Sequence, residues 1–240
     1  MSDTAIAEEP QHAGTPAPAE KVARINDTKL MPCVLRLAEE RDLYFDSLLD
    51  VGCGMRPLNR WFTRYDRAEA PRRYVGIDTD GAVVKNLNEQ GILGLQNFNA
   101  DFSLASDLVI AADVLEYLNP SSANSFLKRC ASLTCKMFAL STLNARHWTR
   151  RGVKKDHSWV KWIPESVVQC FAENETAARI RNLTDADQVA MMMLEAFDAE
   201  KFHIAVYEAW PWEIRDLANG EGEYFYLKTF AVAIAKDEAS

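Results

Sequence analysis

The stretch LLDVGCGMRPL has the residue types and spacing to hold a nucleotide-like ligand. Its apolar run ends in the acid Asp50, and Gly52 and Gly54 follow with one residue between them. A tight Gly-x-Gly turn after a strand lets backbone amides approach a bound nucleotide. The dinucleotide fingerprint fails, because Pro57 stands three residues after Gly54. The Gly-Lys-Ser/Thr motif of a phosphate loop is missing as well.

Two more acids stand after predicted strands in the same half of the chain. The segment RYVGID ends in Asp78, whose carboxylate could accept hydrogen bonds from ribose hydroxyls. Asp101 follows the third predicted strand, ILGLQNF, in the motif NADF, and DLVIAADVLEYL supplies a fourth strand. Parallel strands present their carboxyl ends at one edge of a sheet, and ligands bind outside that edge. We therefore expect these acids at one site.

This succession of landmarks resembles the class I S-adenosylmethionine-dependent methyltransferases, and the resemblance covers residues 28–142. It implies S-adenosyl-L-methionine as the cofactor. The glycine turn would lie under the methionine part, Asp78 would bind the ribose diol, and Asp101 would accept from the adenine amino group. The residues that the resemblance places around the cofactor are Asp50, Gly52, Cys53, Gly54, Asp78, Thr79, Asp101, Phe102, Ala111 and Ala112.

The sequence departs from that family at two positions. Arg56 stands where the family often has a third glycine, so the turn opens differently or carries a basic group towards the pocket. The family's frequent Glu-His pair after the fourth strand is Glu116–Tyr117 here, so no role of that histidine transfers. Tyr117 is instead a candidate substrate contact.

The loop after the fifth predicted strand, KMFALST, should face the transferred methyl group. Between residues 146 and 161 it holds six Lys or Arg against one Asp. The motif STLN, the basic, aromatic stretch that follows it and a later PES resemble, more loosely, the ubiquinone-type O-methyltransferases of small molecules. Two interpretations stay open: a solvated basic surface, or a tryptophan-containing lid that recruits an anionic acceptor. Under the second, Asn144, Arg150 and Trp159 contact the substrate, and His157 or His147 accepts its proton as the catalytic base.

Strands alternate with helices along the chain, which predicts a parallel sheet covered by helices on both faces. The last two strands, KFHIAVYEAW and EYFYLKTFAVAIAK, are expected to form a hairpin with a short polar link. The expected fold is α/β: a Rossmann-like, seven-stranded, mostly parallel sheet with an antiparallel C-terminal hairpin. We predict a disordered tail at residues 1–22 and a single domain at 23–240. Within that domain, residues 143–200 are a substrate-side loop and helical insertion.

Composition limits the class of protein further. The 240 residues can bury one sizeable core, and a net charge of −8 disfavours nucleic-acid binding. The sequence shows no apolar span of about 20 residues and no secretory signal. Five scattered cysteines lack metal-ligand spacing. We expect a cytoplasmic protein without a metal, a nucleic-acid partner or a membrane span, and a homodimer stays open.

The sequence therefore predicts a methyltransferase acting at the oxygen or nitrogen of a small acceptor, which is anionic under the second interpretation of the basic loop. One alternative keeps the enzyme class but changes the acceptor to a protein or an RNA. Another is an inactive partner protein that retains the fold. A nicotinamide-dependent oxidoreductase is disfavoured by Pro57.

Overall fold

The structure, a computed structural model, describes most of the predicted strands. The described residues are 30–55, 58, 71, 73–96, 98, 102–144, 182, 184–208 and 228–236. The predicted tail at residues 1–22, the helix expected after Pro57 and the helix expected from Pro164 lie outside them. Within the described part of the chain, no helix has the length and apolar character needed to cross a membrane.

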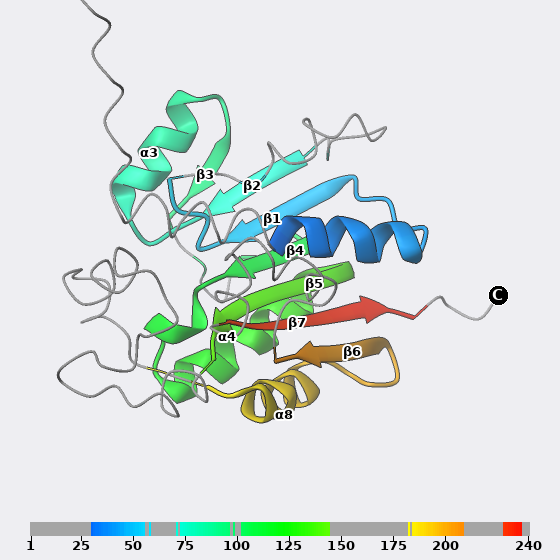
Figure 1. Cartoon of the computed structure of the whole chain (residues 1–240). Helices are drawn as coiled ribbons and strands as arrows, with labels where there is room; N and C mark the ends of the chain where they lie inside the picture. Colours follow the sequence, from blue (N-terminus) through cyan, green and yellow to red (C-terminus); the bar gives the residue numbers. More distant parts are fainter. Residues whose placement is uncertain are drawn as a thin grey trace, which may run out of the picture.

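Seven strands form one sheet in the order β3-β2-β1-β4-β5-β7-β6 (Figure 1). The strands are β1 (Ser47–Val51), β2 (Arg73–Ile77), β3 (Leu93–Leu95), β4 (Ser106–Ala112), β5 (Thr134–Leu143), β6 (Phe202–Tyr207) and β7 (Lys228–Ala235). Strands β1 to β5 pair in parallel, and β7 runs antiparallel between β5 and β6. The predicted fold class, including the antiparallel C-terminal strands, is confirmed.

The central strands are mostly apolar because both of their faces are covered. All five residues of β1 are buried, as are five of the seven residues of β4. Near-continuous apolar runs are typical of parallel strands that lie between two layers. The connection between β6 and β7 falls mostly outside the described residues, so the short link stays a prediction.

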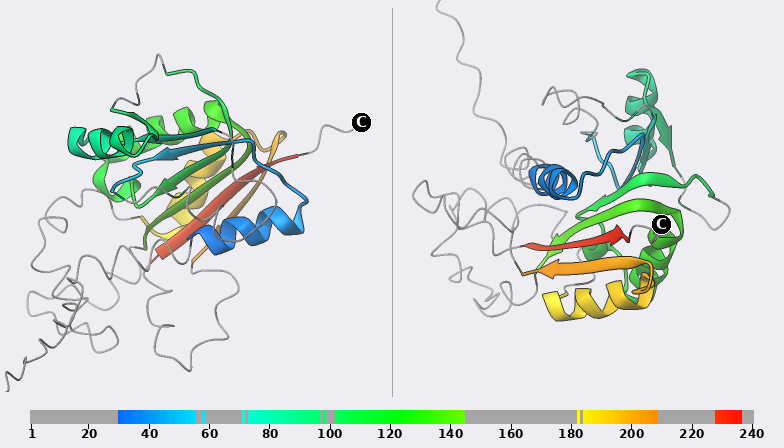
Figure 2. Two further views of the ribbon diagram at one scale, coloured as in Figure 1. Left: turned by 90° about the horizontal axis from the view of Figure 1, so that it is seen from above. Right: turned by 90° about the vertical axis from the view of Figure 1, so that its right-hand side faces the viewer.

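Helices lie on opposite faces of the sheet (Figure 2). Residues 30–40 are helical and cover one face, whereas α4 (Pro120–Leu133) and α8 (Ala186–Ala196) cover the other. Helices α4 and α8 each start at a side-chain cap: Asn119 accepts from the amide of Ser122, and Asp185 forms a capping box with Gln188. A shorter helix, α3 (Gly81–Glu89), follows β2 and starts at Asp80.

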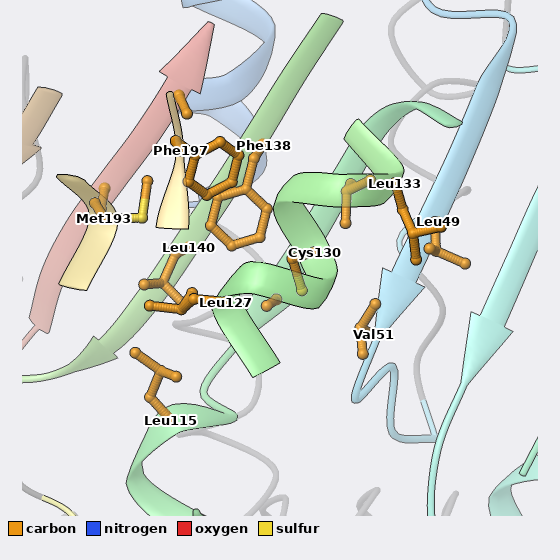
Figure 3. Close-up of a cluster of buried hydrophobic side chains, with 14 of the residues drawn as sticks. Leu49, Val51, Leu115, Leu127, Cys130, Leu133, Phe138, Leu140, Met193 and Phe197 are labelled. Carbon is orange, nitrogen blue, oxygen red and sulfur yellow. The ribbon is translucent and has the colours of Figure 1, made fainter. Parts of the chain in front are cut away.

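The face with α4 and α8 carries a large apolar core (Figure 3). The rings of Phe138 on β5 and Phe197 after α8 lie 5.1 Å apart within it. The methionine run of α8 is divided by the helix period: Met193 is fully buried, whereas Met191 is 65% exposed. This core fixes β4 and β5, whose carboxyl ends form part of the candidate site.

Candidate functional site

The candidate site lies at the edge where the parallel strands end. Strand order reverses between β1 and β4, because β2 and β3 continue to one side of β1 while β4 and β5 continue to the other. Open α/β sheets bind ligands outside the carboxyl ends of their strands at such a switch point. The turn after β1, Asp78 after β2 and Asp113 after β4 all stand at this edge.

The glycine turn after β1 needs glycine for its backbone conformation. Gly52 and Gly54 have φ values of +74° and +59°, in the region that side chains disfavour. A Cβ atom on Gly52 would overlap Cγ2 of Val114, which follows β4, whereas a Cβ on Gly54 would meet no atom within 4 Å. The turn therefore touches the exit of β4 at Gly52 and is open at Gly54.

Asp78 ties this turn to the end of β2. One carboxylate oxygen accepts from the amide of Gly54 at 2.9 Å, and the other accepts from the amide of Asp80 at 2.9 Å. The amides of Gly52 and Cys53 donate to the carbonyl of Ile77 at 2.7 and 3.1 Å. The turn's amides are thus bound within the protein, which the sequence did not indicate. Each carboxylate oxygen of Asp78 can accept a further bond.

Cys53 turns its side chain into the protein. A Cβ on Gly76 of β2 would lie 3.0 Å from its sulfur, and Cys53 clusters with Val83 and Leu87 of α3. Burial raises the pKa of its thiol, and the charges of Asp50 and Asp78 raise it further. The thiol therefore stays protonated at neutral pH, and only the backbone of Cys53 can face a ligand.

Asp50 is buried beneath the turn rather than exposed in the site. Its carboxylate accepts from the hydroxyl of Tyr74 at 2.6 Å and from the amide of Leu58 at 3.4 Å. Only 1% of Asp50 is exposed. Burial and the charge of Asp50 raise the pKa of Tyr74, so the phenol remains a donor. Asp50 thus supports the turn from the protein interior, through its bonds to Tyr74 and Leu58.

The remaining predicted cofactor residues lie around the same edge. Thr79 is exposed after Asp78, and its carbonyl accepts from Nε2 of Gln96 at 3.3 Å. Phe102 is half-buried, with its ring 5.8 Å from that of Phe98. Ala112 is the last residue of β4. Asp101 lies outside the described residues.

The predicted substrate and catalytic residues fall in two groups. Arg150, Trp159, His147 and His157 lie outside the described residues. Tyr117 ends the short 3-10 helix η1 (Leu115–Tyr117) and is 37% exposed near the exit of β4.

Asn144, the other described substrate residue, is fully buried. Its amide nitrogen donates to the carbonyl of Glu208 at 3.3 Å, and it forms a β-bridge with Thr184. Asn144, which follows β5, thus holds together two other segments: the one before α8, through Thr184, and the one after β6, through Glu208.

A buried polar cluster, which the sequence analysis did not single out, lies beside the turn. Nζ of Lys228 on β7 is 2.6 Å from Oδ1 of Asp113 and 3.9 Å from Oε1 of Glu116. The Ser141 hydroxyl donates to Asp113 at 3.2 Å, and the Thr142 hydroxyl donates to Glu116 at 3.0 Å. Two acids three residues apart after a predicted strand are a local sequence pattern typical of a polar site. Nothing near Lys228 in the sequence indicated that its side chain would join them.

Glu116 has an altered ionisation in this cluster. Burial, followed by the negative charge of Asp113, raises its pKa from 4.5 to about 7, although the Lys228 ammonium opposes the shift. The carboxyl therefore titrates near neutral pH. No set of three or more potential metal ligands occurs among the described residues.

Comparison with known proteins identifies the fold. No family model and no curated protein matches the chain. Solved structures do match, and they show that this chain has the fold of the class I S-adenosylmethionine-dependent methyltransferases. The predicted resemblance is confirmed at the level of the fold.

Three of the matching structures illustrate the range of neighbours. The plantazolicin methyltransferase BamL, solved with S-adenosylhomocysteine (SAH) and a triazolic desmethylPZN analogue, has a TM-score of 0.63 at 11% identity, and the match covers 92% of this chain and 88% of BamL. The magnesium protoporphyrin IX methyltransferase ChlM from Synechocystis PCC 6803, with SAH, has a TM-score of 0.58 at 16% identity. The match covers 93% of this chain and 90% of ChlM. A chain of the Pnkp1/Rnl/Hen1 RNA repair complex has a TM-score of 0.51 at 15% identity. That match covers 78% of this chain but spans only 37% of the other.

Proposed function

We propose that this protein binds S-adenosyl-L-methionine and transfers its methyl group to the oxygen or nitrogen of a small acceptor. One observation carries the proposal. The Gly52–Gly54 turn is bound to Asp78 at the point where strand order reverses. The solved neighbours, which contain this cofactor's product, support the choice of ligand.

The residues at this edge fit the cofactor. Gly54 leaves open space where a ligand can approach the backbone, and Asp78 offers acceptor capacity for a ribose diol. The family resemblance assigns Asp101 and Phe102 to the adenine side. When bound, the cofactor supplies a sulfonium methyl group, which is transferred by in-line displacement. The protein's contribution is therefore mainly alignment and exclusion of water.

The acceptor side is proposed from the sequence and from Tyr117. The basic stretch with Arg150 favours an anionic acceptor, Trp159 excludes water, and His157 or His147 takes the acceptor's proton. Asn144 supports this side from within, since its side chain is buried. The neighbours' names give magnesium protoporphyrin IX and plantazolicin as acceptors, so the fold alone sets no acceptor.

Calorimetry with purified protein tests the cofactor. S-adenosylmethionine and SAH should bind, whereas NAD should not. Asp78→Asn keeps an acceptor for the Gly54 amide but removes the charge that holds the diol. It should weaken S-adenosylmethionine about 10- to 100-fold, the scale of a hydrogen bond to a charged group. The matched control is Asp80→Asn, which removes the same charge two residues away and keeps a good helix cap.

Two results would count against the proposal. If neither cofactor form binds the wild-type protein, the site is not a methyl-donor site. If Asp78→Asn and Asp80→Asn bind equally well, Asp78 does not hold the ribose. Labelled methyl transfer to small-molecule and macromolecular fractions of an extract then separates a small acceptor from a protein or an RNA. Cofactor binding without any labelled product would favour an inactive partner protein.

A further inference from the structure

The order of strands determines how a bound S-adenosylmethionine molecule is oriented along the edge of the sheet. Under the proposed function, on which this inference rests, the ribose lies at Asp78 after β2 and the methionine part lies over the turn after β1. The reactive end must then point away from β2, towards β4, β5 and β7. Along that direction the exit of β4 comes first, because Val114 touches the turn at Gly52. Asp113 is the residue between β4 and Val114.

Asp113 is held in a fixed position at this point. Its φ of +56° is uncommon for a residue other than glycine, and strain of this kind often occurs at functional sites. Its amide donates to the carbonyl of Ser141 at 2.8 Å, and its carboxylate meets the Ser141 hydroxyl and the Lys228 ammonium. Its side chain remains 16% exposed at the edge of the sheet, whereas Glu116 behind it is 2% exposed.

Unpaired polar groups surround this cluster. Five buried side-chain atoms of the described residues have no hydrogen-bond partner. Two belong to Arg129 on α4, and the other three are the hydroxyls of Thr184 and Thr229 and the side-chain nitrogen of Asn182. Thr229 stands opposite Thr142 on the neighbouring strand, and the amide of Asn182 donates to the carbonyl of Glu116. Buried polar groups normally have partners, so their concentration here indicates a place that a ligand or ordered water completes.

We propose that the Asp113 carboxylate faces the transferred methyl group and that Lys228 is the positioning residue that orients it. A carboxylate there favours positive charge at the methyl position. Methyl transfer forms a bond from the acceptor to the methyl carbon and breaks the carbon–sulfur bond, leaving both electrons on sulfur, while the acceptor's proton passes to the base of the proposed function or to water. The charge facing Asp113 therefore disappears, and the site binds the donor more tightly than the product.

Two cofactor analogues test this without knowledge of the acceptor. SAH has a neutral thioether, whereas sinefungin carries an amino group, protonated at neutral pH, in place of the S-methyl group. The wild-type protein should bind sinefungin more tightly. Asp113→Asn should reduce the ratio of the two affinities by at least about tenfold, the lower end of what a hydrogen bond to a charged group contributes, and leave SAH nearly unchanged.

Control variants separate orientation from general stability. Lys228→Arg keeps the charge and the orienting contact, so it should leave the sinefungin-to-SAH ratio near that of the wild type. Lys228→Met removes both: a lower ratio shows that Asp113 has lost its orientation, whereas a higher ratio shows that Lys228 acts only through its charge and refutes its positioning role. Asp107→Asn removes the same charge near the amino end of β4, where Asp107 is paired with Lys136, and should leave the ratio unchanged. If Lys228→Met does not fold, the Asp113→Asn and Lys228→Arg ratios decide.

The outcomes are distinct. An unchanged ratio in Asp113→Asn, with both ligands still bound, refutes this inference alone. An equal loss of both ligands shows that Asp113 only supports the fold, and it refutes the inference as well. Failure of the wild-type protein to bind either analogue refutes the proposed function and the inference together.

Discussion

Replacement of Gly52 by alanine tests how closely the glycine turn meets the exit of β4. Gly52 and Gly54 both have positive φ, so an alanine at either position costs about 1–2 kcal/mol in backbone strain. Only at Gly52 does the new methyl group overlap another side chain, that of Val114. Overpacking of that kind typically adds about 1–3 kcal/mol. We expect Gly52→Ala to lose about 2–5 kcal/mol of unfolding free energy and Gly54→Ala about 1–2 kcal/mol.

A double-mutant cycle isolates the steric part. Val114→Ala removes the methyl group that the new Cβ would overlap, so it should recover about 1–3 kcal/mol in the Gly52→Ala background. It should recover nothing in the Gly54→Ala background, which serves as the matched control. Denaturant unfolding measures all these variants, and SAH calorimetry shows whether the turn still accepts the ligand. Equal losses at the two glycines, with no coupling between Gly52 and Val114, would refute the described contact.

Two further predictions concern the polar cluster and the basic stretch. Since the pKa of Glu116 is raised from 4.5 to about 7, folding takes up a proton between these values, and the stabilisation from this carboxyl is lost as pH rises towards 7. Thermal unfolding from pH 5 to 8 should therefore show wild type losing stability relative to Glu116→Gln; parallel curves would contradict the shift. Neutralising Arg150, Arg151, Lys154 and Lys155 should lower labelling of an anionic small-molecule fraction in the methyl-transfer assay, less so at high salt, with SAH affinity unchanged. Labelling equal to wild type would leave the stretch a solvated surface.

The strands and the turn could be predicted because their signals are local. Strands β1 and β4 are mostly apolar since both faces of the sheet are covered, and that pattern is visible in the sequence alone. The glycines of the turn were detectable because positive φ restricts the residue type. Asp78 could be placed at the same edge because parallel strands end together, and the structure adds its bond to the Gly54 amide.

Other features depend on which side of an element a residue occupies after folding. The sequence did not show that the side chain of Cys53 packs against α3, that Asp50 lies beneath the turn, or that Asn144 is buried. Each is a polar or reactive residue next to a predicted site. Burial or exposure of such a residue depends on neighbours that are distant in the sequence.

The sequence by itself determined the class of fold and the edge at which a cofactor would bind, since both follow from local periodicity and from the order of elements. Only the tertiary structure decided that β7 inserts between β5 and β6 and so brings Lys228 to Asp113 and Glu116. The physical reason is the range of the interactions. Strand propensity and turn geometry act over a few residues. An ion pair between Lys228 and Asp113 forms only after β7 has paired with β5.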